Sequence, residues 1–328
     1  MSLRPETMIK KLKGPLTIFP THFAANGDLD LGAARASAQY AKEVYAGHDG
    51  CIMIAGSTSE FYAMTDEESL TLIKTVVDEI NGAVPVIVGT GRAATRLSID
   101  MSLKAQDLGI DLAMVSNPYY MHVSEEGLFR HFSQIAEQLD VGLMIYDNPT
   151  TSKIAIPPHL MKRLSQVPNI IGVKENTTNI ENYYWMRTMV HPEDMVITCG
   201  IGHLMYMFEA PWGSPAFVSE LLCFAPDLAF GIYDAATEKD YGKMKELLDS
   251  LIPYHQFVSR CVARRKIPSI LGQEWGGKAT TVYQSILKNA MELVGLPGGI
   301  VREPLENITD QEVKELRSVL IEIGILDR

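Results

Sequence analysis

Residues 170–176 read Ile-Ile-Gly-Val-Lys-Glu-Asn, so four apolar or small residues run directly into a lysine. A short continuous apolar run is typical of a strand buried on both faces, as in parallel sheets. A lysine at the end of such a strand lies where the core opens into a pocket, and burial there lowers its pKa from about 10.4. The neutral amine is a nucleophile that can form a Schiff base with a carbonyl. Taken alone, the pattern also fits a lysine that points into water.

Apolar runs alternate with segments of helical periodicity along most of the chain. The other candidate strands are 16–19, 51–54, 86–88, 112–115, 142–146, 195–198 and 216–219. Such regular alternation predicts a parallel sheet, and eight βα units predict a closed (β/α)8 TIM barrel. An open, doubly wound sheet is the alternative, but it would need a glycine fingerprint after the first strand, and the sequence has none there.

The strand pattern stops near residue 238, which suggests a change of architecture. Helical segments follow at 240–263, 279–293 and 310–323. The last begins with a capping box, in which Thr309 and Glu312 can each satisfy a free backbone N–H. We therefore predict an N-terminal tail over 1–13, a barrel over 14–237 and a small C-terminal helical domain over 238–328.

Composition excludes several classes of protein. The 328 residues are 46% hydrophobic and carry a net charge of −11 without a basic stripe, which argues against a nucleic-acid partner. No apolar stretch is long enough to predict a membrane span. The four cysteines are scattered without a Cys-x-x-Cys motif, and the N-terminus lacks the apolar region of a signal peptide. These features favour a protein of the reducing cytoplasm.

Polar groups follow several of the predicted strands. In a barrel of this kind the C-terminal ends of the strands meet at one rim, where the active site lies. The rim segments are Gly56-Ser57-Thr58-Ser59-Glu60, Asn117-Pro118-Tyr119-Tyr120, Tyr146-Asp147-Asn148-Pro149 and Lys174. Hydroxyls, phenols and one amine would thus share a rim, and this conjunction favours a pocket position for Lys174.

These segments resemble the dihydrodipicolinate synthase/N-acetylneuraminate lyase family of class I aldolases. The motifs, written as the family has them, are G-[ST]-T-G-E at 56–60, P-x-Y at 118–120, Y-N-x-P at 146–149 and G-[IV]-K-E at 172–175. Each motif is short, but four in order at strand ends are specific together. The resemblance runs over nearly the whole chain, from Gly14 to the glycine-rich segment at 295–299 and beyond.

The resemblance implies catalytic roles for four residues. Lys174 would form the Schiff base with pyruvate or another 2-oxo acid. Tyr146 would be the general acid and base beside it. Ser57 and Tyr120 would relay protons to Tyr146, with Tyr120 reaching its target across a subunit boundary. An iminium is an electron sink, so making or breaking the adjacent C–C bond needs only a positioned proton carrier.

The resemblance also implies where the substrates bind. Gly56, Ser57 and Thr58 would bind the carboxylate of the 2-oxo acid through hydroxyl and backbone N–H groups. Asn148 and Thr151 would lie on the loop that sets specificity for the second substrate, an aldehyde. The implied enzyme is a cytoplasmic homotetramer that uses no metal and no other cofactor.

Four residues depart from the family pattern. Ser59 replaces the second glycine of its loop, which restricts the backbone there. Asp147 replaces an asparagine and would add negative charge near the site. His22 stands where the family has proline, and we interpret it as a surface loop residue rather than a catalytic one. Thr151 replaces the arginine with which dihydrodipicolinate synthases bind a second carboxylate, and a threonine cannot form that bidentate pair.

Three functions remain open at this point. The first is a Schiff-base lyase or aldolase acting on a 2-oxo acid. The second is a related enzyme of the same family, either a 2-oxo-acid dehydratase or 4-hydroxy-tetrahydrodipicolinate synthase itself. The third is a barrel that binds a 2-oxo acid without turnover. A sensor needs neither nucleophile nor proton carrier, so the pair Lys174 and Tyr146 argues against the third.

Overall fold

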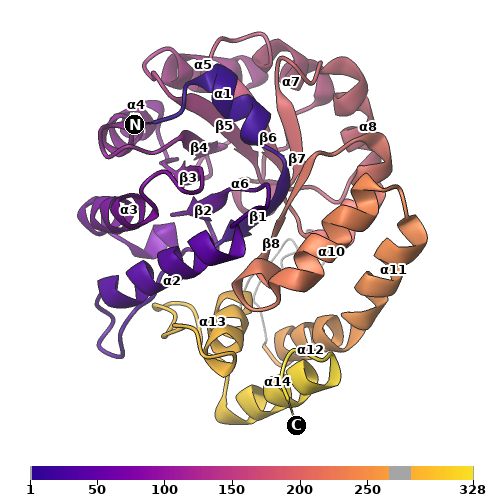
Figure 1. The fold of residues 1–328 in the computed structure, drawn as a ribbon. Coiled ribbons are helices and arrows are strands. Elements are labelled where there is room, and N and C mark those ends of the chain that lie inside the picture. Colours follow the sequence, from indigo (N-terminus) through magenta and orange to yellow (C-terminus); the bar gives the residue numbers. More distant parts are fainter. Residues whose placement is uncertain (1, 266–281, 328) are drawn as a thin grey trace.

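The computed structural model describes residues 2–265 and 282–327. Within these residues, eight parallel strands close into a barrel in chain order, with β1 also pairing with β8, and helices surround it (Figure 1). The predicted (β/α)8 fold is thereby confirmed. The strands are β1 (Gly14–Ile18), β2 (Ile52–Ile54), β3 (Val86–Gly89), β4 (Leu112–Ser116), β5 (Gly142–Asp147), β6 (Ile170–Glu175), β7 (Val196–Cys199) and β8 (Ala216–Ser219).

Helices follow every strand and form the outer layer of the barrel. They are α2 (Leu31–Val44), α3 (Asp66–Ile80), α4 (Thr95–Asp107), α5 (Glu125–Ala136), α7 (Pro158–Leu164), α8 (Ile180–Met189), α9 (His203–Glu209) and α10 (Pro226–Thr237). Shorter pieces are the helices α1 (Pro5–Met8) and α6 (Pro149–Ser152) and the 3-10 turns η1 (Ile9–Lys11), η2 (Phe61–Ala63), η3 (Ala210–Trp212) and η4 (Glu220–Cys223).

The C-terminal region is helical, as predicted, but one helix was predicted wrongly. Its helices are α11 (Tyr241–Ser250), α12 (Ile252–Ala263), α13 (Tyr283–Leu293) and α14 (Asp310–Glu322). The single helix expected over 240–263 is two helices that meet at Leu251, because Pro253 fits only the first turn of a helix. Residues 279–281 of the next expected helix lie outside the described residues. None of the helices in the described ranges is long and apolar enough to span a membrane.

The barrel interior is filled by apolar side chains, many of them methionine. The inner cluster includes Leu16, Ile18, Met53, Ile87, Leu112, Met114, Met144, Ile171, Val196 and Val218. Met8 and Leu12 join this cluster from the segment before β1, so the predicted tail contains a short helix that closes the end of the barrel where the strands begin. The outer core, between strands and helices, is continuous with the C-terminal helices.

A one-residue offset between β5 and β6 determines where the lysine points. Leu143 pairs with Ile170, but Met144 pairs with Gly172, so Ile171 is an extra residue. Because of this bulge Lys174 pairs with Tyr146, on the inner face, and not with Asp147 on the outer face. The backbone there is crowded, since a Cβ on Gly172 would lie 3.0 Å from a methyl carbon of Leu12.

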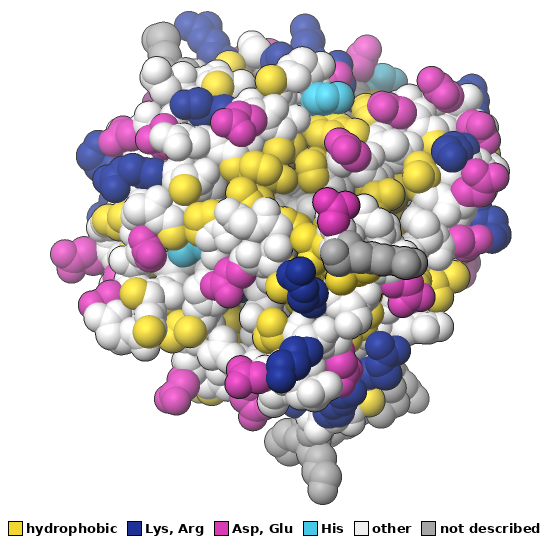
Figure 2. Space-filling model, turned by 60° about the horizontal axis from the view of Figure 1, so that its bottom comes forward, with side chains coloured by type: hydrophobic (Ala, Val, Ile, Leu, Met, Phe, Trp, Pro, Cys, Tyr) yellow, Lys and Arg dark blue, Asp and Glu magenta, His cyan; other side chains and the backbone are white. Residues whose placement is uncertain are grey.

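The surface in Figure 2 carries acidic and basic side chains that are interspersed, with hydrophobic side chains gathered between them. Several large apolar residues are exposed on this chain. One set lies on the loop after β4 and includes Tyr120, Met121 and Val123. Another lies on α8, α9 and η3 and includes Trp185, Leu204, Phe208 and Trp212.

Candidate active site

Lys174 lies on the inner face of β6, near the carboxyl end of the strand. Its side chain is 3% exposed. Burial lowers its pKa to about 7, and the described residues supply no charged partner that would raise it again. A Cβ on Gly200, at the end of β7, would lie 2.7 Å from the Lys174 Cγ, so this glycine makes room for the stem. The amine is thus held in a dry place where its neutral, nucleophilic form is accessible near neutral pH.

Tyr146 stands beside the lysine on the neighbouring strand. The Lys174 Nζ lies 4.5 Å from the centre of the Tyr146 ring. Asn148 Nδ2 donates a hydrogen bond of 2.9 Å to the phenol oxygen, and Ser57 Oγ lies 3.5 Å from the same oxygen. Burial raises the pKa of Tyr146, and the hydrogen bonds from Ser57 and Asn148 oppose that rise. The structure therefore joins four residues that the sequence had placed on three separate strand ends.

The row of inward-facing polar groups extends to both sides of this pair. Ser116 pairs with Tyr146, and Thr198 pairs with Lys174. The Thr198 hydroxyl donates to the Val173 carbonyl, whereas the Ser116 hydroxyl has no hydrogen-bond partner within the described residues. Sequence reasoning missed both residues, although each ends a strand that it had identified.

The loop after β2 brings the predicted carboxylate-binding groups to the same end of the barrel. Thr58 Oγ1 lies 2.9 Å from the hydroxyl of Tyr283, which is the first residue of α13. Gln284 Nε2 donates to the Ser57 carbonyl at 3.5 Å. Tyr283 and Gln284 could not be predicted, because no sequence pattern indicates which face of the barrel the C-terminal helices cover.

A small hollow adjoins the Tyr146 side chain. Its lining residues are Ala55, Gly56, Phe61, Gly89, Gly91, Met114, Ser116 and Tyr146. Gly56, which was predicted to bind the substrate, therefore borders the same space as the Tyr146 side chain. This space lies among the ends of β2, β3, β4 and β5.

Two predicted site residues lie away from Tyr146 within one chain. Tyr120 is 82% exposed on the loop after β4, and no described contact joins it to Tyr146. Thr151 is exposed on α6, where its hydroxyl donates to the Asn148 carbonyl at 3.2 Å. Lys153 Nζ donates to the Thr151 carbonyl at 2.6 Å, so this cation is bound to its own turn.

Asp147 does not add charge to the pocket, which corrects the expectation from sequence. It is fully buried on the outer face of β5, where it accepts hydrogen bonds from Asn117 Nδ2 at 2.7 Å and from the Ile156 backbone at 3.1 Å. Burial raises the pKa of Asp147 to about 7 against these two bonds. Its role is to fix the segment after β5, and this outer position follows from the alternation of side chains along a strand.

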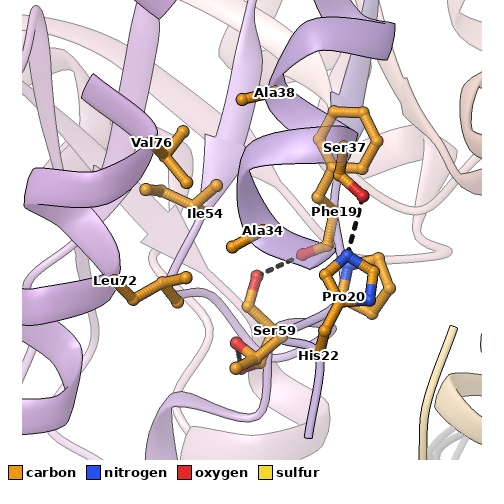
Figure 3. Close-up of a pocket in the computed structure, with 11 residues that line it drawn as sticks. Phe19, Pro20, His22, Ala34, Ser37, Ala38, Ile54, Ser59, Leu72 and Val76 are labelled. Carbon is orange, nitrogen blue, oxygen red and sulfur yellow. Dashed lines mark hydrogen bonds between the residues drawn. The ribbon is translucent and has the colours of Figure 1, made fainter. Parts of the chain in front are cut away.

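His22 is not a surface residue, which corrects a second expectation. It is 3% exposed, and its ring nitrogens lie 2.7 Å from Ser37 Oγ and 2.9 Å from the Gly298 carbonyl oxygen. Burial lowers the pKa of His22 to about 4. Figure 3 shows the ring directed toward α2, among the residues that line a hollow between the strands and helices. Both nitrogens have structural partners, so the geometry gives His22 no catalytic task.

Ser59, which replaces a glycine of the family motif, also has a structural role. This role could not be predicted from the replacement itself. Its hydroxyl donates to the Phe19 carbonyl at 2.6 Å, as Figure 3 shows, and Thr21 Oγ1 donates to the Ser59 carbonyl at 2.5 Å. The positive φ angles of this loop fall on Ala55 and Glu60, at 54° and 53°, and not on Ser59. A serine is therefore tolerated where the family motif has glycine.

No group of three or more His, Cys, Asp or Glu side chains in the described ranges is arranged to hold a metal ion. The four cysteines are free and buried.

Comparisons with known proteins agree with this geometry. Residues 11–271 match the model of the dihydrodipicolinate synthetase family. A 4-hydroxy-tetrahydrodipicolinate synthase of Desulforudis audaxviator is 30% identical over 95% of this chain and 97% of its own length. A second enzyme of that name, from Nitrobacter hamburgensis, is 27% identical over 97% of this chain and 98% of its own length.

Solved structures are similar over the whole fold. Dihydrodipicolinate synthase DapA-2 of Bacillus anthracis has a TM-score of 0.81 at 26% identity and covers 97% of this chain and 99% of its own. YagE, a prophage protein of E. coli K12 whose structure contains pyruvate, has a TM-score of 0.82 at 24% identity and covers 96% and 99% of the two chains.

Proposed function

The chain belongs to the dihydrodipicolinate synthetase family of carbon–carbon lyases and synthases, and on this basis we propose that Lys174 is its Schiff-base lysine. The observation that carries the proposal is the pair of Lys174 and Tyr146, which lie side by side on adjacent strands with the amine buried. The substrate would be pyruvate or a larger 2-oxo acid, and the reaction would make or break the C–C bond next to the imine carbon.

The proposed cleavage follows from the chemistry of an iminium. The neutral Lys174 amine adds to C2 of a 4-hydroxy-2-oxo acid, and loss of water leaves a protonated imine. Tyr146, as phenolate, takes the proton of the C4 hydroxyl while the C3–C4 electron pair moves into the iminium. An aldehyde leaves, and the enamine that remains is protonated at C3 and hydrolysed to pyruvate. Condensation is the reverse of this sequence.

The neighbouring hydroxyl groups support this assignment of roles. Ser57 lies 3.5 Å from the phenol and would pass protons to and from it. Asn148 donates a hydrogen bond to the same oxygen and would stabilise the phenolate form. Gly56, Ser57 and Thr58 would bind the carboxylate of the 2-oxo acid. Thr151, on the turn after β5, would contact the aldehyde partner.

We further propose that Tyr120 acts across a subunit boundary in a homotetramer. Its 82% exposure leaves it free to reach a neighbouring chain, and exposed aromatic groups are typical of interfaces. The two exposed apolar sets, one on the loop after β4 and one on α8, α9 and η3, would supply the two kinds of contact that a dimer of dimers requires. The four free cysteines suit a cytoplasmic location.

Trapping of the imine tests the central proposal. With pyruvate and borohydride, the intact mass should rise by one reduced adduct, and peptide mapping should place it on Lys174. Lys153 is an internal control, because its exposed ammonium should stay unmodified under the same conditions. An adduct on another lysine, or none with any member of a panel of 2-oxo acids, would falsify the assignment.

A second candidate is 4-hydroxy-tetrahydrodipicolinate synthase, the name that the two curated relatives described above carry. That reaction condenses pyruvate with an aldehyde that has its own carboxylate. In place of an arginine, this turn has Thr151 on α6 and, directly after the helix, Lys153, whose ammonium group is bound to the Thr151 carbonyl. We therefore propose a neutral aldehyde as the partner, polyhydroxylated or aromatic.

A further inference from the structure

A buried ion pair links the C-terminal helices to the loop that carries Ser57 and Thr58. Lys288, on α13, donates a hydrogen bond of 2.6 Å from its Nζ to Glu60 Oε1, and both side chains are fully buried. The other Glu60 oxygen accepts the Arg302 backbone N–H at 2.9 Å. Lys288 also donates to the Ile300 carbonyl at 2.5 Å. Two of the three N–H donors of Lys288 and both carboxylate oxygens of Glu60 are thus engaged, and they join two distant parts of the chain.

The backbone of Glu60 connects this ion pair to the loop that carries Ser57 and Thr58. Its φ of 53° is a left-handed conformation that non-glycine residues adopt only when their surroundings hold them there. Its N–H donates to the Ser57 carbonyl at 3.1 Å, which closes a tight turn over Ser57 and Thr58. The Glu60 carboxylate and the Ser57 backbone are therefore linked through this one turn.

The C-terminal side of the contact is itself rigid. Ile300 and Phe23 form an isolated antiparallel bridge, and a Cβ on Gly299 would lie 2.5 Å from the Phe23 carbonyl oxygen. The Arg302 guanidinium is paired with Glu68 of α3, and it lies 4.1 Å from the Phe23 ring. The segment that contains Ile300 and Arg302 is therefore held in place, and its backbone groups bind Lys288 and Glu60.

We propose that Lys288 is a positioning residue, which holds the loop over the reacting atoms through Glu60. This rests on the proposed function, because it assigns the loop a task at Tyr146. The Ser57 hydroxyl is only just within hydrogen-bond distance of the Tyr146 phenol, at 3.5 Å, so a small shift of the turn would break the relay. The C-terminal helices thereby complete a site whose nucleophile and proton carrier both lie on the barrel.

The test compares three variants of the full-length protein. Lys288→Met leaves the Glu60 charge buried and unpaired, which destabilises the fold as well as the loop. The double variant Glu60→Gln/Lys288→Met removes both charges, so its thermal stability should return toward wild type while the turn stays unanchored. Arg265→Met is the matched control. It removes an ion pair that joins the segment just after α12 to the buried Glu312 of α14.

Two readouts separate positioning from stability. Hydrogen exchange at the amides of residues 57–60 should be slow in wild type and in Arg265→Met, and fast in both Lys288 variants. Once the substrate is known, kcat/KM should fall about 10²-fold in both Lys288 variants, the scale for a displacement of about 1 Å, and should be unchanged in Arg265→Met.

Several outcomes would overturn the inference. The first is fast exchange at residues 57–60 in the wild-type protein. The second is that activity in the double variant returns together with its thermal stability. The third is that Arg265→Met loses activity in proportion to the fall in its melting temperature. Exchange needs no substrate, so a failure of the positioning role is distinct from a failure of the Schiff base, which the pyruvate adduct on wild type tests alone.

Discussion

Burying the Lys174 side chain as an ammonium ion costs free energy. This cost lowers the pH at which the amine loses its proton and becomes nucleophilic. Its pKa of about 7 lies below the ordinary value of 10.5 because of burial. Folding therefore favours loss of its proton between those two pH values. At neutral pH a large fraction of the amine is nucleophilic without any help from a neighbouring base.

Replacing Lys174 with an uncharged residue should remove this cost and make the fold more stable. Lys174→Met should melt at a higher temperature than wild type below pH 7, where the wild-type fold must hold a charged amine in a dry place. Between pH 7 and 10.5 the folded protein binds fewer protons than the unfolded chain, so wild-type stability rises with pH. The difference in melting temperature should narrow over that range, as a calorimetric series would measure. A difference that is constant with pH would contradict the lowered pKa.

Tyr146 should carry the proton in the C–C step. Burial raises its pKa, so the phenol is protonated at rest and needs Asn148 and Ser57 to lose its proton. Tyr146→Phe should lower turnover by roughly 10²–10⁴-fold, the usual effect of a lost general acid or base, while the protein stays folded. Tyr206→Phe, which alters another buried tyrosine on the outside of the barrel, should have no such effect. Near-normal turnover in the Tyr146 variant would mean that another group moves the proton.

At the scale of elements, the sequence predicted what local patterns encode. Alternating strands and helices gave the barrel, and the polar strand ends gave Lys174, Tyr146 and the loop after β2. The bulge at Ile171 could not be predicted, because an apolar run has the same pattern in either register. Tyr283 and Lys288 were missed for a different reason, since no local signal tells a C-terminal helix which barrel loop it will contact.

The short helix α6 should exclude one reaction of the family. A charge-assisted bond to a second carboxylate contributes about 1.5–3 kcal/mol, or one to two orders of magnitude in rate or affinity. Thr151 cannot supply it, and Lys153 is bound to the Thr151 carbonyl and lacks the forked geometry of arginine. A coupled assay with pyruvate and aspartate semialdehyde should thus show weak or no dihydrodipicolinate synthase activity.

Complementation of a lysine auxotroph is the matching test in cells, and we expect no growth. Efficient turnover together with rescue of growth would show that the enzyme binds an anionic aldehyde after all. Lys153→Ala would then reveal whether that lysine has taken the place of the missing arginine.

At the scale of the whole molecule, Tyr120, which belongs to the family's P-x-Y motif, lies away from Tyr146 of its own chain. Tyr120 lies on the loop after β4 with Met121 exposed beside it, at 82% and 69%. The aromatic set on α8 and η3 is separate, and there Tyr184 packs edge-on against Trp185 and Trp212 at 5.2 and 5.0 Å. Two apolar surfaces on one chain fit an assembly with two different interfaces, only one of which would carry Tyr120 to a neighbour.

Light scattering should therefore find a tetramer, and two variants should divide it in different ways. Trp212→Glu places a charge on the α8–η3 surface and should leave dimers that still turn over, since the loop after β4 remains covered. Met121→Glu charges the other surface and should remove Tyr120 from the neighbouring site, so that turnover falls together with assembly.

Tyr120→Phe is the control for that loss, because it should lower turnover while the tetramer persists. A wild-type monomer at working concentration would refute the assembly, and full activity in Tyr120→Phe would refute the role of this tyrosine across the boundary.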